Sequence, residues 1–169
     1  MKRAGQAQPP MHALSREVGK RLAARGWMLA TAESCTGGLL GALITGVPGS
    51  SAYYVGGVVS YADSAKIRLL GVPRALLAEH GAVSASVARE MAGGVRRRLK
   101  ADIGVGITGI AGPGGGSDRK PVGLVFISLA GPSGCLTRRF LFAGGRDSIR
   151  RAACVAALVW LREAGAMPG

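Results

Sequence analysis

The sequence predicts an α/β fold, a single domain of three α/β/α layers in which a mixed sheet ends in a hairpin. The length of 169 residues suits one domain. Short apolar runs alternate with segments of helical spacing, which is the order expected of strands and helices in an α/β sheet. Near the C-terminus, two such runs are separated by the tight turn at 132–134, so they should pair as an antiparallel hairpin.

The first elements are a helix, a strand and a second helix. Leu14, Val18 and Leu22 follow helical spacing, and Gly26 is a natural C-terminal stop. The segment before them combines Gly, Gln and two prolines without periodicity, so we expect a disordered tail there. The predicted elements, in order, are a tail at 1–11, which precedes the domain at 12–169, a helix at 13–25, a strand at 28–32 and a helix starting near 39.

The middle of the chain adds a strand and three helices. A Val-rich stretch predicts the strand, Gly71 ends the next helix, and Pro73 opens the one after it. Ser84 or Ser86 can cap a longer helix, whose last turn carries basic residues that complement the helix dipole. The predicted elements are a strand at 55–61 and helices at 63–70, 73–79 and from the cap to about 99.

The last third closes the sheet. The glycine-dense segment GIAGPGGGSDRKP is too flexible to be anything but a loop. A strand lies on either side of it, a further strand completes the hairpin, and a final helix follows the turn at Gly144 and Gly145. The predicted elements are a strand at 102–108, a loop at 109–121, strands at 122–129 and 136–142, and a helix at 147–163.

The strong positive charge allows two classes of partner. A net charge of +13 and a pI near 11 make nucleic-acid binding a legitimate hypothesis. The basic residues are scattered, however, and three Phe and three Tyr give no interleaved aromatic platform for bases. The sequence therefore does not favour nucleic acid as a partner, and an anionic small molecule fits the charge equally well.

Neither a membrane nor a metal is indicated. The longest apolar run near the C-terminus, 152–161, is too short to span a bilayer, and Lys2 and Arg3 precede the polar GQAQPP rather than an export signal. We therefore predict a cytoplasmic protein without contact with a membrane. Three cysteines with no CxxC spacing, far in sequence from both histidines, indicate neither a disulfide framework nor a metal site.

The first candidate site is the strand-to-helix junction at Ser34. Such a junction exposes its residues and aims the free backbone N–H groups of the helix start at one point, beside a nucleophile. Gly37 and Gly38 leave the backbone open to a substrate. Alternatively, Ser34 or Thr36 simply caps the helix. Cys35 is a rival nucleophile, but no histidine stands near it, so we interpret it as a packed thiol.

Tyr61 and Lys66 form the second candidate. They straddle the next strand-to-helix junction, so both can point into one mouth at the end of the sheet. A lysine whose pKa is lowered by burial and neighbouring positive charge can serve as the base for a serine. Lys66 stands among apolar neighbours rather than in a charged run. The alternative is an ordinary surface lysine on an amphipathic helix.

The loop at 109–116 and two arginines could bind an anion. Its five glycines allow backbone N–H groups to form an anion-binding nest, although the loop matches neither the P-loop nor the dinucleotide fingerprint. Arg146 and Arg150 lie one turn apart at the start of the last helix, where the dipole favours acidic residues. This awkward placement suggests an anionic ligand.

Four motifs in order carry a family resemblance: TAESCTGG (31–38), PGSSAYY (from Pro48), SYADSAK (60–66) and GITGIAGPGGG (106–116). The chain resembles the C-terminal domain of the competence and damage-inducible protein CinA over about residues 14–164. Stand-alone members of that family are nicotinamide-nucleotide amidohydrolases (NMN deamidases of the pyridine nucleotide cycle). One departure is the Val55, Gly56, Gly57 segment, where many relatives have bulky, charged residues.

The resemblance implies hydrolysis of nicotinamide mononucleotide to nicotinate mononucleotide and ammonia, by a serine and lysine pair without metal or other cofactor, in a homodimer. Ser34 is the implied nucleophile and Lys66 its base, with Tyr61 relaying or orienting the proton and Thr108 assisting. The implied substrate-binding residues are Cys35, Thr36, Gly37, Gly38, Gly112, Gly114, Gly115, Arg146 and Arg150. A non-catalytic nucleotide-binding or regulatory domain remains the alternative, and a nucleic-acid-associated protein a weaker one.

Overall fold

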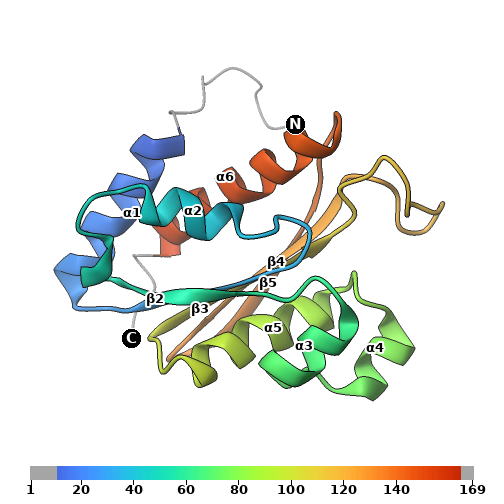
Figure 1. Cartoon of the computed structure of the whole chain (residues 1–169), viewed down its shortest axis with the longest axis horizontal. Coiled ribbons are helices and arrows are strands. Elements are labelled where there is room, and N and C mark those ends of the chain that lie inside the picture. Colours follow the sequence, from blue (N-terminus) through green and yellow to red (C-terminus); the bar gives the residue numbers. More distant parts are fainter. Residues whose placement is uncertain (1–10, 165–169) are drawn as a thin grey trace.

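The computed structural model describes residues 11–164, which form a five-stranded sheet between two layers of helices (Figure 1). The strand order is β2-β1-β3-β4-β5. The first three of these strands run parallel, and β4 and β5 are antiparallel to their neighbours, so the sheet is mixed and ends in a hairpin as predicted. The strands are β1 (Leu29–Glu33), β2 (Tyr54–Val59), β3 (Ile103–Gly109), β4 (Leu124–Gly131) and β5 (Gly134–Leu141).

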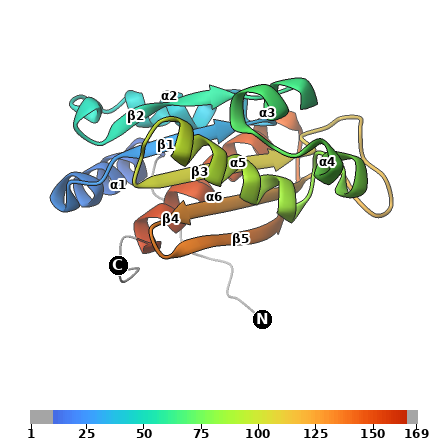
Figure 2. The same cartoon turned by 90° about the horizontal axis from the view of Figure 1, so that it is seen from below.

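Helices cover both faces of the sheet, which confirms the three-layer α/β/α prediction. Helices α1, α2 and α6 lie on one face, and α3, α4 and α5 on the other (Figures 1 and 2). A single 3₁₀ turn, η1 (Ser50–Ala52), precedes β2. The helices are α1 (Met11–Arg25), α2 (Leu39–Thr45), α3 (Asp63–Leu70), α4 (Arg74–His80), α5 (Ala85–Arg98) and α6 (Arg146–Ala164).

Most predicted boundaries agree with these elements to within two residues. The expected tail at 1–11 falls almost wholly outside the described residues, and α1 already begins at Met11. The strand expected from 122 begins at Leu124 because Gly123, with φ of 93°, makes a turn first. The strand expected to reach 61 ends at Val59, since the next residues lead into α3.

The sheet separates two apolar clusters. The larger one packs β1, β3 and β4 against α1, α2 and α6, and the smaller one packs Ala30 and Ala32 of β1 against α3 and α5. Small residues on this second face let α5 lie directly on the backbone of β3: a Cβ at Gly106 would overlap the carbonyl oxygen of Ala88. The same face continues past the carboxyl ends of the parallel strands, where polar side chains replace the apolar ones.

Candidate active site

Three hydroxyl side chains form a row across the carboxyl ends of the parallel strands. Glu33 pairs with Val59 on one side and Ile107 on the other. The ladder continues one residue further, because the N–H of Ser60 donates to the Glu33 carbonyl oxygen at 2.8 Å and that of Ser34 to the Ile107 carbonyl oxygen at 3.0 Å. Side chains alternate between faces, so Ser34, Ser60 and Thr108 all lie on the face covered by α3 and α5.

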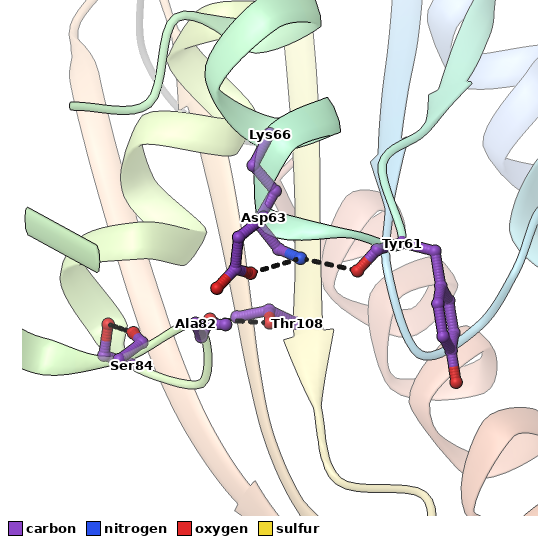
Figure 3. Close-up of polar contacts among 7 residues, drawn as sticks. Tyr61, Asp63, Lys66, Ala82, Ser84 and Thr108 are labelled. Atoms are coloured by element: carbon purple, nitrogen blue, oxygen red, sulfur yellow. Dashed lines mark hydrogen bonds and ion pairs between the residues drawn. The ribbon is translucent and has the colours of Figure 1, made fainter. Parts of the chain in front are cut away.

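Lys66 enters the same face from α3. Its side chain is only 1% exposed, which excludes the alternative of an ordinary surface lysine. Its Nζ donates to the carbonyl oxygen of Tyr61 at 2.9 Å and lies 3.4 Å from Oδ1 of Asp63, as Figure 3 shows. No hydrogen bond joins Nζ to Ser34 in the described part of the chain.

The other groups around Lys66 are differently placed from what the sequence suggested. Figure 3 shows the ring of Tyr61 extending away from Nζ, so Tyr61 contacts the lysine through its carbonyl oxygen and not through the hydroxyl that we expected to relay a proton. Thr108 lies on the strand next to Lys66 in the same view, and its hydroxyl donates to the Ala82 carbonyl oxygen at 2.8 Å.

Glu33, which sequence reasoning missed, caps α2. Its carboxylate is buried and accepts three backbone N–H groups, from Gly38 at 3.1 Å, Leu40 at 3.0 Å and Gly41 at 2.8 Å. The alternative that Ser34 or Thr36 caps this helix is therefore wrong. The expectation that the N–H groups of the helix start are free to meet a substrate is wrong as well. The Glu33 carboxylate, five to eight residues earlier in the chain, already accepts those N–H groups.

Two N–H groups in the turn after Ser34 remain available. Those of Cys35 and Thr36 donate to no other residue within 11–164, and they belong to the two residues that directly follow the candidate nucleophile. Gly37 and Gly38 complete the turn with φ of 61° and 91°, conformations that favour glycine. This turn therefore offers two backbone donors beside the Ser34 hydroxyl.

Cys35 packs as a thiol. Its side chain is buried in the larger apolar cluster, against α2 and α6. Burial, and to a lesser degree the charge of Glu33, raises the pKa of the Cys35 thiol to about 11, although Arg146 and Arg150 oppose the shift. A neutral thiol at physiological pH is a poor nucleophile.

Arg146 and Arg150 reach the site from the first turns of α6. Arg150 Nη2 donates to the Thr36 carbonyl oxygen at 2.8 Å. Arg146 donates through Nη1 to the Gly112 carbonyl oxygen at 2.8 Å and through Nη2 to the Tyr61 hydroxyl at 3.0 Å. The two guanidinium groups thus tie together the serine turn, the glycine loop and the segment before α3.

The glycine loop is open to solvent on its outer side. Gly114 and Gly115 line a shallow pocket with Ser117 and Asp118, whereas Gly112 faces Arg146. The loop and the arginines border the serine turn, so an anionic group could bind next to the hydroxyl row. Within residues 11–164 no three His, Cys, Asp or Glu side chains gather as metal ligands, and no helix is long and apolar enough to cross a bilayer.

Sequence reasoning also missed Ser60 and Asp63. Both stand in the SYADSAK motif, and the alternation of side chains along adjacent strands would have placed Ser60 beside Ser34 had the register been known. Asp63 lies one helical turn before Lys66, a spacing at which side chains meet.

Known proteins resemble the chain over nearly its whole described length. The CinA C-terminal domain family matches residues 11–164. A CinA-like protein of Geobacter sulfurreducens is 58% identical over 139 residues, covering 82% of this chain and 34% of that protein, and one of Anaeromyxobacter sp. is 54% identical over 160 residues, 95% of this chain and 38% of that protein. The chain thus spans about a third of the length of these curated relatives.

Solved structures of shorter proteins resemble it along their whole length. A CinA superfamily protein of Klebsiella pneumoniae has a TM-score of 0.91 and 39% identity, covering 94% of this chain and 99% of that one. A CinA superfamily protein of Escherichia coli has a TM-score of 0.90 and 34% identity, with coverage of 96% and 95%.

Proposed function

The chain belongs to the CinA C-terminal domain family, and from this premise we propose that it hydrolyses the carboxamide of nicotinamide mononucleotide to the carboxylate and ammonia. The proposal rests chiefly on one observation. A serine followed by two backbone N–H groups that have no acceptor in the described part of the chain lies on the same sheet face as a fully buried lysine. Amide hydrolysis without histidine needs a hydroxyl as nucleophile, an amine as base and two N–H groups that can donate to the oxyanion.

In the proposed reaction, the Ser34 hydroxyl oxygen attacks the carboxamide carbon and its proton passes to Lys66. Lys66 must be uncharged when it accepts the proton, and it later gives the proton to the departing ammonia. The N–H groups of Cys35 and Thr36 would hold the oxyanion, each donor contributing about 3 kcal/mol to the transition state. Water then hydrolyses the acyl ester on Ser34.

The basic groups fit the phosphate of a mononucleotide. Arg146 and Arg150 lie beside the serine turn and the glycine loop, and the acceptors of both guanidinium groups among residues 11–164 are neutral oxygens. A phosphate would offer these groups stronger, charge-assisted hydrogen bonds. We therefore assign phosphate binding to the two arginines with the N–H groups of the loop around Gly112, Gly114 and Gly115.

Ammonia release from nicotinamide mononucleotide tests the proposal. We expect release by the wild type and a loss of at least about 10³-fold in Ser34→Ala and Lys66→Ala. Two matched variants control for generic effects: Ser15→Ala removes a buried hydroxyl on α1, and Lys20→Ala removes an exposed lysine. Equal turnover in all five proteins would refute the mechanism, and calorimetric binding without ammonia would favour a non-catalytic nucleotide-binding domain.

We also propose that the protein is a homodimer. Within residues 11–164 neither edge strand, β2 or β5, pairs with a further strand, and both carry exposed apolar residues that a partner could cover. These residues are Val55, Val59, Leu136 and Leu141. Light scattering should give twice the chain mass of 17.2 kDa; a monomer at micromolar concentration would rule the dimer out.

A further inference from the structure

Ser60 carries a buried hydroxyl that the reaction scheme above does not use. It is 0% exposed, and its Oγ has no hydrogen-bond partner in the described part of the chain. A buried hydroxyl without a partner destabilises the folded state, since the lost hydrogen bonds to water are not replaced. Its presence next to the candidate nucleophile therefore suggests a function in which it gains partners.

The backbone of Ser60 is close to that of both reacting groups. Across the sheet it is the neighbour of Ser34, since its own N–H continues the ladder from β1. Along the chain it precedes Tyr61, whose carbonyl oxygen holds the Lys66 Nζ. Ser34 and Lys66 are not hydrogen-bonded to each other, so a direct path for the proton is missing in the resting structure.

Other hydroxyls near the site are already engaged or differently directed. Thr108 donates its proton to the Ala82 carbonyl oxygen. The Tyr61 hydroxyl is bonded to Arg146, and its ring extends away from Nζ (Figure 3). Thr36 also lacks a side-chain partner, but it belongs to the turn whose carbonyl faces Arg150 of α6. Ser60 is thus the hydroxyl next to both Ser34 and the segment that anchors Lys66.

We propose that Ser60 relays the proton between Ser34 and Lys66, an inference that rests on the proposed amide hydrolysis. As the Ser34 oxygen bonds to the carboxamide carbon, its O–H bond breaks and the proton moves to Ser60 Oγ. In the same step Ser60 gives its own proton to the uncharged Lys66 amine, and the carbonyl electron pair moves onto the oxyanion. On collapse, the Lys66 ammonium gives a proton to Ser60 Oγ while Ser60 gives its own proton to the leaving nitrogen; the carbonyl re-forms, the C–N bond breaks and ammonia departs.

The test is the Ser60→Ala variant, which deletes the hydroxyl and adds no atoms. We expect kcat to fall by about 10²-fold or more, with KM within about twofold of the wild type, because general acid–base steps contribute on this scale. The melting temperature should not fall, since an unsatisfied group is removed. In the matched variant Ser15→Ala, which loses a buried hydroxyl bonded to the Met11 carbonyl oxygen, the melting temperature should fall while kcat is kept.

A solvent-isotope measurement separates a relay from a structural role. The dependence of kcat on the deuterium fraction should be curved in the wild type, with two protons in flight, and linear in Ser60→Ala. Wild-type turnover in Ser60→Ala would overturn the relay, and so would a loss of kcat accompanied by a lowered melting temperature. Absence of ammonia release by the wild type would refute the proposed function and, with it, the relay. Ammonia release that Ser60→Ala leaves unchanged would refute the relay alone.

Discussion

Replacing Glu33 with Gln should destabilise the fold strongly, although it changes only one atom of a side chain. The carboxylate accepts three backbone N–H groups, one on Oε1 and two on Oε2. A glutamine keeps a single acceptor oxygen, so at least one of the three backbone N–H groups then faces the amide NH₂. The remaining hydrogen bonds have a neutral acceptor in place of a charged one. With hydrogen bonds to charged groups contributing about 1.5–3 kcal/mol and neutral ones about 1 kcal/mol, the loss should total about 2–4 kcal/mol.

Urea and thermal unfolding would measure this effect. In a chain of this length, each kcal/mol of lost stability lowers the melting temperature by about 2–4 °C, so the variant should melt about 5–15 °C lower. Glu79→Gln is the matched control, because that side chain is 73% exposed and should change the stability by less than about 0.5 kcal/mol. A Glu33→Gln variant as stable as the control would show that the carboxylate does not anchor the turn that carries Ser34.

Arg146, Cys35 and Gly106 each make a contact whose loss can be measured. Arg146→Ala should raise KM for the mononucleotide about 10- to 100-fold with little change in kcat, because a charge-assisted contact to the phosphate is lost. For a substrate without phosphate, KM should stay the same. Burial raises the pKa of the Cys35 thiol to about 11, so the folded state keeps this proton at pH values where the unfolded chain loses it. The resulting stabilisation is complete below the pKa of the unfolded chain, and the free energy of unfolding should fall as the pH rises from about 9 to 11. In Cys35→Ala this fall should be less steep. Gly106→Ala should destabilise the fold by about 3 kcal/mol or more, because its Cβ would overlap the Ala88 carbonyl oxygen, whereas Gly145→Ala meets no atom and should be tolerated.

The order of elements was predictable because local signals mark it. Apolar periodicity located the strands and helices, and glycines such as Gly71 ended the helices where the structure ends them. The apolar neighbours of Lys66 likewise pointed to its burial. These features depend only on residues near each other in the chain.

The missed features depend on register and long-range pairing. Whether Ser60 lies beside Ser34 is fixed by the alignment of β1 with β2, which shifts between Leu29 and Ala30. Gly41 and Glu33 are eight residues apart, and their hydrogen bond arises only once the turn is folded. The same holds for the Tyr61 hydroxyl, which binds Arg146 of α6, 85 residues away.

In the proposed mechanism, the Ser34 oxygen becomes covalently bonded to the carbonyl carbon of the substrate. Rapid acid quenching of the enzyme during turnover of nicotinamide mononucleotide, followed by peptide mass spectrometry, tests it most directly. The nicotinoyl mononucleotide mass should appear as an ester on the peptide that contains Ser34, and should be absent in Ser34→Ala. Ammonia release with the adduct on Cys35, or an undiminished rate in Ser34→Ala, would contradict the account.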